Sequence, residues 1–483
     1  MLGENYSLAA SYLAEADVIV AGGGSAGFSA ALAAARQGAK TILVEKNAIL
    51  GGVATMGMMM SIGNHICTGD DRLAIRGIPE ELVDRLARES GTNPNWKSAK
   101  HQHITFDIEV MIDLMYRMLS EAGVKILINT TVTDTLMDGN RIKGVLISHD
   151  KAGRFRLSGK TFVDATGDAL LAAQAGEVCT LNKDQATMLY LLSDVDLDEL
   201  YEFLRTHQEQ YPTHLDHDST FAEFEKNWLE NGIFHTPHGG GLIYSFIQDA
   251  VKEGGYKKQV GNIGGLDVLG LFGLKQNKTC LINSNVLFVD CGDPWQSSSV
   301  EIEARGMIKP CVDFFRKAMP GFQNAKLVSS AREIGLRGWR RIHGQYPFTN
   351  SEKGKPSRFP DVVWCGPCIG WAESKIPAEK FFGGGLKYLG GQVKLNTMHD
   401  VPFRALRPNN VPNLVMASGK SYAGGCLRPI AHCLAAGQAA GVAAALAAPL
   451  GDFDKMDIRS LQSALLRQGV YLGDTQRLKE LGL

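Results

Sequence analysis

Hydrophobic positions near the N-terminus change from strand-like to helix-like spacing and back again. Residues 17–21 form a short apolar run, residues 25–38 are rich in alanine, and residues 41–45 form a second apolar run that ends on an acid. Short apolar runs with β-branched residues predict buried strands, whereas the longer alanine-rich stretch predicts a helix. The pattern therefore predicts a strand–helix–strand unit with parallel strands.

The same criteria predict elements along the rest of the chain. The predicted helices cover residues 78–90, 107–122, 197–207, 221–231 and 432–448. The predicted strands cover residues 124–133, 141–148, 154–158, 161–165, 280–290, 362–364 and 413–417. The strands over 141–148 and 154–158 flank the turn at 150–153, so we expect them to form a hairpin.

The pattern of the sequence changes in the middle of the chain. From about residue 185, charged and aromatic helical segments alternate with strands and glycine clusters, and near Val401 the pattern of the N-terminal part returns. A chain of 483 residues exceeds one typical domain. We expect an α/β fold: a Rossmann-type domain built from residues 1–184 and 396–483, with an inserted α+β substrate domain over residues 185–395.

Composition and charge exclude several classes of partner. The net charge of −1 gives no global field for nucleic acid or an anionic membrane. The apolar run over 18–35 is broken by glycines and lacks a basic leader, so we do not expect a signal peptide. The run over 433–450 contains Gln438 and favours a buried helix over a membrane span. Nine cysteines without a dense framework indicate a reducing compartment, and we expect the cytoplasm.

A glycine motif lies between the first predicted strand and helix. Gly22, Gly24 and Gly27 fit the spacing G-x-G-x-x-G. The first glycine permits a tight turn, the second lets a pyrophosphate approach the backbone, and the third lets the helix pack on the strand. Glu45 follows Gly27 by 18 residues, where an acid accepts a hydrogen bond from a ribose hydroxyl. The alternative is a glycine-rich packing turn.

Three features favour FAD over NAD as the dinucleotide. A second glycine turn, Gly51-Gly52, directly follows the acidic strand end. The predicted hairpin interrupts the domain before the strand at 161–165, and the C-terminal segment completes the same domain.

The sequence contains no second G-x-G-x-x-G, which a separate NAD(P)H-binding domain would carry. We therefore expect electrons to come from an organic substrate and to leave to oxygen, a quinone or a carrier protein.

The chain resembles a known family through most of its length. The segments VIVAGGGSAGFSAALAAARQGAKTILVEK, LGGVATMG, FVDATGDALLAAQAG, IGLRGWRRIHG and NLVMASGKSYAGG carry the resemblance. They are similar to the FAD-dependent oxidoreductase family of glutathione-reductase-like flavoproteins, relatives of the succinate dehydrogenase and fumarate reductase flavoproteins. Residues 185–280 carry little of it. The fumarate reductase catalytic arrangement is not recognisable, so the resemblance does not imply that activity.

The resemblance implies a set of FAD contacts. The residues at the pyrophosphate would be Gly22, Gly24, Ser25, Ala26 and Gly27, with Glu45 and Lys46 at the ribose and Val132 at the adenine. The residues on the flavin side would be Gly51, Gly52 and Thr55, then Ala165, Thr166, Gly167 and Asp168 of a second motif, and Gly419, Lys420, Gly437, Gln438 and Ala439. Lys420 stands where the family often has arginine, and it keeps the charge without the guanidinium fork.

The predicted alanine-rich helix near the C-terminus could stabilise negative charge on the flavin. A helix that begins near Ala435 with only small side chains could bring its positive end to the flavin, where negative charge develops on reduction. The alternative is that this is an alanine-rich packing helix.

Histidines and arginines are the candidates for the chemistry. His65 could be a base or a covalent tether to the flavin, and His432 sits near Arg428 and Tyr422 in the sequence. His235 and His238 flank a glycine run. Four arginines could clamp a carboxylate or phosphate: Arg332, Arg337, Arg340 and Arg341. Arg337 falls in the family's arginine motif. Structural histidines and solvated arginines are the alternatives.

Cys365 and Cys368 form a C-x-x-C pair after Trp364. A dithiol of this spacing is redox-active when a helix N-terminus lowers the pKa of one thiol. The alternative is two buried thiols at a turn, and no further cysteines at ligand spacing indicate a metal site.

Three functional hypotheses follow. The first is a dehydrogenase or oxidase that transfers a hydride between a small organic substrate, anionic or neutral, and the flavin N5 atom. The second is a dithiol–flavin enzyme that uses Cys365 and Cys368. The third is a flavoprotein subunit that passes electrons to a partner. We expect a small-molecule substrate, no nucleic acid and no membrane span. A homo-oligomer is compatible with the sequence.

Overall fold

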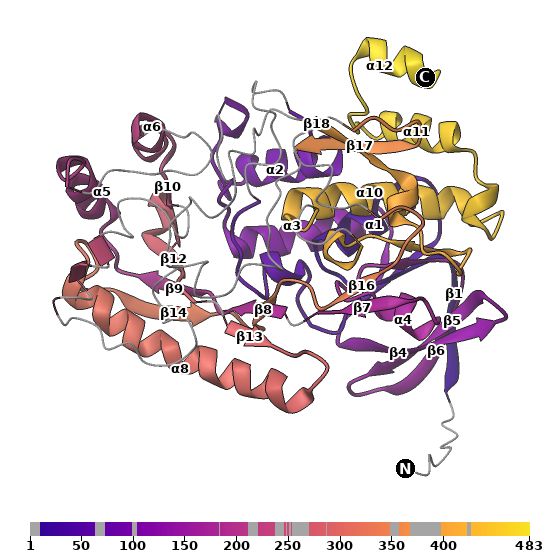
Figure 1. The fold of residues 1–483 in the computed structure, drawn as a ribbon, viewed down its shortest axis with the longest axis horizontal. Coiled ribbons are helices and arrows are strands. Elements are labelled where there is room, and N and C mark those ends of the chain that lie inside the picture. The colour runs from indigo at the N-terminus through magenta and orange to yellow at the C-terminus, as the bar shows by residue number, and fades with distance from the viewer. Residues whose placement is uncertain are drawn as a thin grey trace.

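The structure is a computed structural model of the 483-residue chain. It describes residues 10–62, 73–98, 104–182, 184–210, 221–236, 246–247, 249–250, 253, 270–285, 287–347, 357–367, 398–422 and 427–483. Figure 1 shows two groups of strands with helices around them, joined by short strands.

The larger sheet has seven strands, in the order β3-β2-β1-β6-β5-β4, with β19 also paired to β6. Its strands are β1 (Ser11–Ala21), β2 (Thr41–Val44), β3 (Lys125–Leu127), β4 (Thr130–Asp138), β5 (Arg141–His149), β6 (Gly153–Asp164) and β19 (Leu414–Met416). β3, β2, β1, β6 and β19 run parallel, whereas β5 pairs antiparallel with both β6 and β4. The predicted strand–helix–strand unit and the hairpin are confirmed. The chain returns to this sheet at β19, as the sequence predicts.

Helices cover the large sheet. They are α1 (Ser25–Arg36), α2 (Ile78–Arg88), α3 (Ile108–Glu121), α4 (Leu170–Gln174), α10 (Ile430–Ala447), α11 (Ile458–Arg467) and α12 (Thr475–Leu481). α1 and α10 pack closely because Gly437 and Gly441 present no side chain: a Cβ at either would overlap the carbonyl oxygen of Ala26 or Ala30. α10 is the one described helix that is long and apolar enough to cross a membrane, and 89% of that stretch is buried inside the structure.

The smaller sheet has the order β10-β11-β12-β9-β14. Its strands are β9 (Tyr190–Ser193), β10 (Ile233–Thr236), β11 (Gly270–Leu274), β12 (Thr279–Asn283) and β14 (Lys326–Ser330), with α5 (Leu197–Thr206), α6 (Phe221–Asn231) and α8 (Pro294–Ala318). The single strand predicted over 280–290 is wrong. β12 ends at Asn283 and β13 (Leu287–Val289) is separate, because Asn285 between them bonds both backbone groups of Met188.

Short strands join the two parts. β7 (Cys179–Leu181) pairs with β16 (Arg340–Ile342), and β8 (Asp184–Thr187) pairs with β13 and β15 (Gly335–Leu336). A further pair, β17 (Val362–Pro367) and β18 (Met398–Pro402), lies beside α10 and α11 (Figure 1). Residues 362–364 thus pack beside elements of the Rossmann-type part, although the predicted boundary assigns them to the inserted domain.

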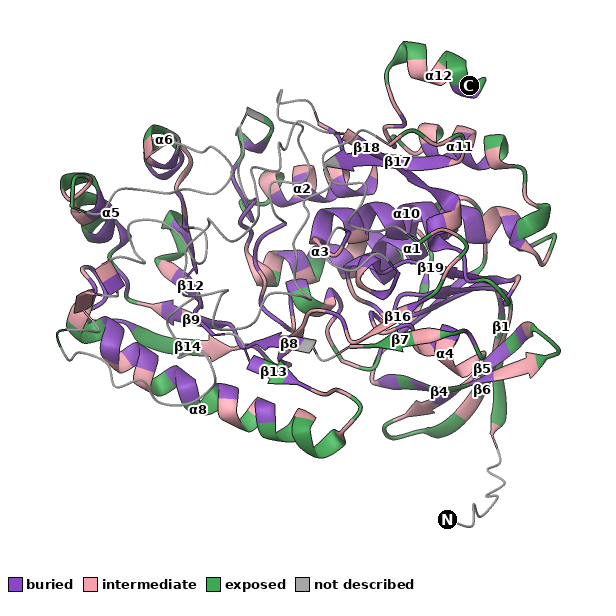
Figure 2. Ribbon diagram, viewed as in Figure 1, coloured by how far each residue is buried: buried purple, intermediate pink, exposed green. Residues whose placement is uncertain are grey.

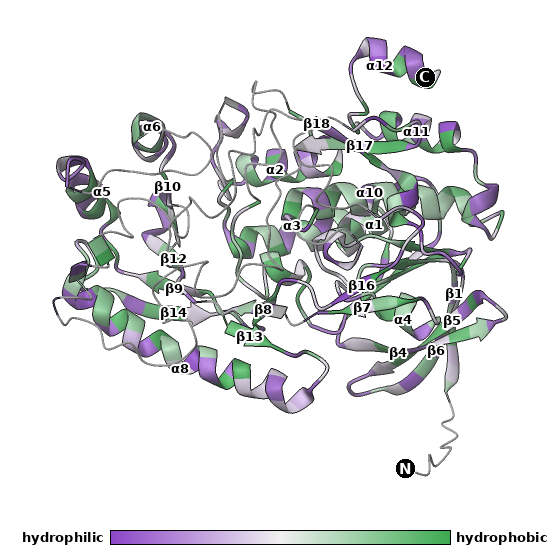
Figure 3. Cartoon of the chain, in the orientation of Figure 1, coloured by the Kyte–Doolittle hydropathy of each residue, from purple (hydrophilic) through white to green (hydrophobic). Residues whose placement is uncertain are grey.

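The interior of both parts is apolar. Figure 2 shows α1, α10 and β19 mostly buried, and β1 and β6 are buried toward their C-terminal ends. Figure 3 shows that α10 is mostly hydrophobic. The 3-10 turns on the surface of this core are η1 (Gly52–Ala54), η3 (Trp96–Ser98), η5 (Lys275–Asn277), η8 (Phe403–Leu406), η9 (Gly419–Ser421) and η11 (Phe453–Lys455).

Candidate functional site

The predicted cofactor residues gather at one edge of the large sheet. The glycine turn follows β1, Glu45 follows β2, the second motif follows β6 and Gly419 follows β19. These four strands are parallel, so their carboxyl ends share one edge. In open α/β sheets ligands bind outside this edge. The fold therefore brings together motifs that lie up to about 400 residues apart in the sequence.

Two glycines of the first turn are required by the protein itself. Gly22 has φ +97°, and a Cβ there would lie 2.5 Å from the carbonyl oxygen of Ala165. A Cβ at Gly27 would overlap the carbonyl oxygen of Gly22. These positions let the start of α1 pack against the ends of β1 and β6.

Gly24 is different, because the chain has room for a side chain there. Its φ of −64° is accessible to any residue, and the nearest atom to an added Cβ is the Cα of Gly52 at 3.9 Å. The open space lies at the first turn of α1. In the described part of the chain no side chain caps this helix end, and its first turn has no acid. Uncapped N–H groups and bare backbone form a cradle that fits a pyrophosphate.

The second glycine turn lies against the first. The Gly51 N–H donates to the carbonyl oxygen of Gly23 at 2.8 Å, and Ser25 Oγ donates to the Gly51 carbonyl oxygen at 3.3 Å. Gly51 and Gly52 both have positive φ. Thr55 is buried, and its hydroxyl donates to the Leu50 carbonyl oxygen at 2.5 Å, which fixes the turn.

Glu45 is anchored beside the glycine turn. Its carboxylate accepts from the Gly23 N–H at 2.5 Å and from the Asn47 N–H at 2.8 Å, and burial raises the pKa of this carboxyl. The next residue, Lys46, forms an ion pair with Glu333. Val132 is buried on β4, the edge strand of the sheet, close to where the Thr130 N–H donates to the Glu45 carbonyl oxygen.

The second motif is organised by a buried acid that the sequence analysis did not single out. Asp164 accepts from the N–H and the hydroxyl of Thr166, at 3.1 and 2.7 Å, and from the Ala172 N–H at 3.1 Å. Burial raises its pKa. Its place directly before Ala165 in the segment FVDATGD was the available signal. Asp164 thereby holds the turn that carries Gly167, with φ +86°.

Two cationic side chains contact Asp168. Lys420 Nζ lies 3.5 Å from its carboxylate, and Arg340 donates to its carbonyl oxygen at 3.1 Å. Arg341 is half-buried, and its Nε has no hydrogen-bond partner among the described residues. An added Cβ at Gly338 would lie 3.6 Å from Lys420 Cβ and 3.9 Å from Arg341 Nη2. We call Lys420, Arg340 and Arg341 the cationic group.

The other two arginines of the sequence cluster lie against different segments of the chain. Arg337 is half-buried and directly follows β15, and its backbone N–H donates to the Gln185 carbonyl oxygen at 3.1 Å. Arg332 is exposed, and its backbone N–H donates to the Met56 carbonyl oxygen at 2.9 Å.

Tyr422 and His432 are both buried. Tyr422 Oη has no hydrogen-bond partner in the described part of the chain, and burial raises the pKa of the phenol well above its usual value. His432 Nδ1 accepts from the indole N–H of Trp364 at 3.3 Å. Arg428 lies at the start of α10, where its carbonyl oxygen accepts from the Cys433 thiol at 3.3 Å.

The remaining histidine candidates lie elsewhere. His65 and His238 fall outside the described residues. His235 is on β10 of the smaller sheet, against Phe272.

The prediction that the C-terminal helix begins near Ala435 is wrong. α10 begins at Ile430, after the N-cap Pro429, because Pro429 is compatible with a helix start and the apolar run extends to it. Residues 437–439 therefore lie inside the helix. Gln438 accepts from the Ile78 N–H at 2.9 Å and donates to the Gln468 carbonyl oxygen at 3.1 Å. Their contact with a flavin stays a prediction.

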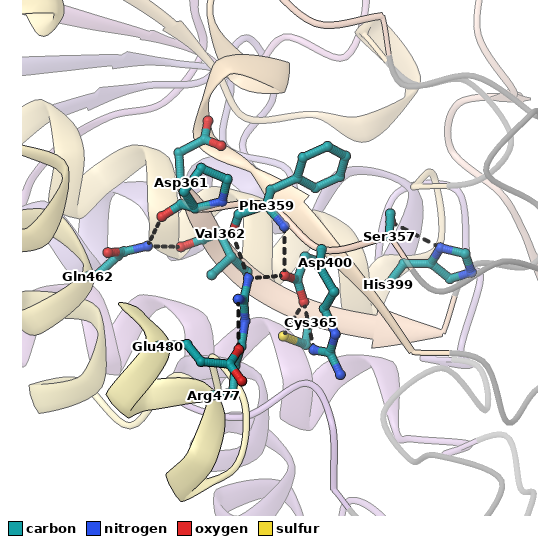
Figure 4. A network of polar contacts seen from close by, with 12 residues as sticks. Ser357, Phe359, Asp361, Val362, Cys365, His399, Asp400, Gln462, Arg477 and Glu480 are labelled. Atoms are coloured by element: carbon teal, nitrogen blue, oxygen red, sulfur yellow. Dashed lines mark hydrogen bonds and ion pairs between the residues drawn. The ribbon is translucent and has the colours of Figure 1, made fainter. Parts of the chain in front are cut away.

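Cys365 lies in a polar network on the strand pair β17–β18 (Figure 4). Its thiol donates to Asp400 at 3.5 Å, and Asp400 also accepts from Arg477 at 2.7 Å and from Arg358 at 3.1 Å. Burial, and the charge of Asp400, raise the pKa of the Cys365 thiol well above its usual value. This environment favours the thiol over the reactive thiolate. Cys368 lies outside the described residues.

Comparison with known proteins agrees with the geometry of the sheet edge. A family model described as FAD dependent oxidoreductase matches residues 17–465, and the chain belongs to this family. The protein is thus an enzyme that uses FAD as its cofactor. The cradle at Gly24, Gly51 and Gly52 fits this cofactor, since it leaves room at an uncapped helix N-terminus.

Individual relatives are more distant. Thiamine thiazole synthase from Methanococcus vannielii is 30% identical over 180 residues, which are 36% of this chain and 63% of that protein. The chain thus spans less than two thirds of the length of this curated relative. Among solved structures, a geranylgeranyl bacteriochlorophyll reductase-like protein from Thermoplasma acidophilum covers 94% of this chain and 84% of its own, with 12% identity and a TM-score of 0.45. The myxobacterial chondrochloren halogenase CndH covers 94% and 79%, with 12% identity and a TM-score of 0.44.

Proposed function

We propose that the chain transfers a hydride between a small, anionic organic substrate and FAD bound across the carboxyl ends of β2, β1, β6 and β19. The observation that carries this proposal is the cationic group at the second motif, where Lys420 lies against Gly167 and the Nε of Arg341 is buried and without a hydrogen-bond partner among the described residues. Bound FAD supplies a hydride acceptor at its N5 atom.

The glutathione-reductase-like subtype is part of this proposal. Five parallel strands support it, together with the antiparallel pair β4–β5 that lies next to β6. The return of the chain to the same sheet at β19 also supports it. The inserted substrate domain is supported by the second sheet, whose strands lie between residues 190 and 330.

Arg341 and Lys420 would bind the substrate anion. A half-buried guanidinium with an unused Nε–H can donate to a carboxylate, and a charge-assisted hydrogen bond of this kind orients as well as binds. Asp168 already neutralises part of the charge of Lys420, at 3.5 Å. The net positive charge that remains selects an anion over a neutral analogue.

Tyr422 would bind a substrate oxygen as a hydrogen-bond donor, and the proton that the substrate releases on hydride transfer would pass to solvent. Its hydroxyl is buried and lacks a hydrogen-bond partner in the described part of the chain, and its raised pKa keeps it protonated. A neutral phenol can donate a hydrogen bond to a substrate oxygen without a change of charge. His432 is less suited, because Nδ1 already accepts from Trp364.

The experiment is anaerobic reduction of the purified, FAD-loaded protein by a panel of small molecules. The panel pairs hydroxy and amino carboxylates with their neutral amides and esters. We expect at least one carboxylate to bleach the flavin absorbance, and its neutral analogue to act at least about tenfold less efficiently. If neutral analogues work equally well, or if no compound bleaches the flavin, the proposal is wrong.

A variant pair locates the anion site. Arg341→Gln should raise the KM for the active carboxylate about tenfold or more, through loss of a charge-assisted bond. Lys309→Gln removes an exposed cation on α8 and should leave KM unchanged.

A further inference from the structure

The outer face of α8 carries the two most exposed large apolar side chains of the described residues. Trp295 is 82% exposed and Ile302 is 73% exposed. They are seven residues apart, so they lie on one face of the helix. A tryptophan this exposed on a regular helix is uncommon in a monomer, since aromatic side chains concentrate at interfaces.

Small residues alternate with these two on the same face. Ser299 and Gly306 continue the spacing of four and three residues. The Ser299 hydroxyl donates to the Trp295 carbonyl oxygen at 2.8 Å, so its polar atom is already satisfied. A Cβ added at Gly306 would meet nothing within 4 Å. The face therefore reads large, small, large, small along the helix, and we call Trp295, Ser299, Ile302 and Gly306 the α8 stripe.

The α8 stripe is complementary to itself. The pairs Trp295 with Gly306 and Ser299 with Ile302 are both centred between residues 300 and 301. When two copies of α8 pack antiparallel about that point, each large side chain of one copy faces a small residue of the other. A two-fold axis makes every such contact twice, which is the geometry of an isologous dimer.

The charges along α8 fit the same arrangement. About the centre between residues 300 and 301, residues 290–300 contain two acids and no Lys or Arg, whereas residues 301–317 contain four Lys or Arg and three acids. Antiparallel packing places the acidic half of one helix beside the basic half of the other. In this register Lys309, whose side chain is 84% exposed, lies next to the N-cap Asp293 of the second copy. The helix dipoles also oppose each other favourably.

We propose that the protein forms a homodimer through antiparallel packing of α8 against α8 of a second copy. The inference is independent of the proposed function. Two tryptophans bury roughly 150–250 Å² each, which is less than the ~800 Å² that each partner contributes to a standard interface. The dimer is therefore weak and dissociates on dilution into the micromolar range.

Gly306 has a competing local role that the test must separate. Pro310 lies inside α8, and a proline ring crowds the carbonyl of the residue four positions before it, which is Gly306. That crowding concerns the backbone, whereas the dimer needs the empty space beyond the Cα.

The first experiment is sedimentation velocity of the full-length holoprotein over a hundredfold range of concentration. Gly306→Leu fills the gap on the exposed face, should keep or improve the stability of the monomer, because leucine favours helix over glycine, and should weaken dimerisation at least tenfold. Ile302→Ser should do the same by removing the partner surface. Leu450→Ala removes a 44% exposed apolar side chain outside α8 and should leave dimerisation unchanged. A monomer at every concentration, or a Gly306→Leu protein that dimerises normally, would overturn the proposal.

The second experiment tests the register. Trp295→Cys mixed with Gly306→Cys should form an intermolecular disulfide under mild oxidation, because these positions face each other. Neither variant alone should do so, since like positions are offset by 11 residues, or roughly 16 Å along the axis. Equal cross-linking of a single variant with itself would rule out the antiparallel register.

Discussion

The carboxyl edge of the large sheet and the strand pair β17–β18 each carry a recognisable redox motif, and the protein treats them in opposite ways. At the sheet edge, Gly24 leaves space that the chain does not fill, and Tyr422 and Arg341 have polar atoms without partners among the described residues. At β17, the Cys365 thiol donates to Asp400, and Asp400 also accepts from two arginines. A motif indicates function where the fold leaves its groups unsatisfied, and structure where the groups satisfy one another.

The largest predicted effect concerns Gly27, which has no room for a side chain, in contrast to Gly24 at the same sheet edge. Gly27→Val should unfold the protein, because its side chain would overlap the Gly22 carbonyl, at a cost of more than about 4 kcal/mol. Thermal unfolding and soluble yield measure this. A stable Gly27→Val protein would show that the contact of α1 with β1 is not required.

Asp400→Asn tests whether the β17–β18 network is structural. The variant takes a carboxylate charge away from Arg477, which is mostly buried and keeps Glu480 and the Phe359 carbonyl oxygen as partners, so the free energy of unfolding should fall by about 2 kcal/mol. FAD affinity of the folded protein should not change. Chemical denaturation measures the free energy of unfolding, and FAD titration measures the affinity for the cofactor. Loss of FAD binding at unchanged stability would place this network in the functional site.

Tyr422→Phe tests the unpaired hydroxyl. The rate of flavin reduction by the active substrate should fall about tenfold, the loss expected for one hydrogen bond to the substrate. The free energy of unfolding should stay equal or rise, because an unpaired buried hydroxyl costs roughly 1–3 kcal/mol. In the wild type the raised pKa keeps the phenol protonated, so this group should cause no loss of rate as pH rises to about 10. Stopped-flow absorbance at several pH values checks both points. An alkaline loss that disappears in Tyr422→Phe would contradict the account.

Cys365→Ala should have the smallest effect. Loss of one buried thiol should lower the free energy of unfolding by about 1 kcal/mol and leave turnover unchanged. Abolished turnover with FAD still bound would instead establish the dithiol hypothesis.

The parts of the fold that are local in sequence could be predicted. The glycine turn, the acid at Glu45 and the hairpin of β5 and β6 each depend on residues close together in the chain. α8 was not predicted, although Asp293 and Pro294 are an N-cap and a first-turn proline, because Gly306 and Pro310 break its periodicity. The contact of Cys365 with Asp400 joins residues 35 positions apart and leaves no spacing signal.

The candidate site shows the same division. The sequence places Gly22, Glu45 and Gly167 at strand ends, whereas only the assembled fold brings Arg340 and Lys420 to Asp168. The arginine cluster also divides in space: Arg340 and Arg341 join the cationic group and Arg332 is exposed on the surface. Sequence spacing gives no information about this separation.

The most direct test of the account is the FAD dissociation constant of Gly24→Ala. The chain accommodates this methyl group, so the variant should keep the wild-type melting temperature to within a few degrees. If the space at Gly24 belongs to the pyrophosphate, FAD should bind at least about tenfold more weakly. Gly306→Ala, also an open position, is the matched control and should bind FAD normally. Wild-type FAD affinity in Gly24→Ala would contradict the placement of the cofactor at this edge.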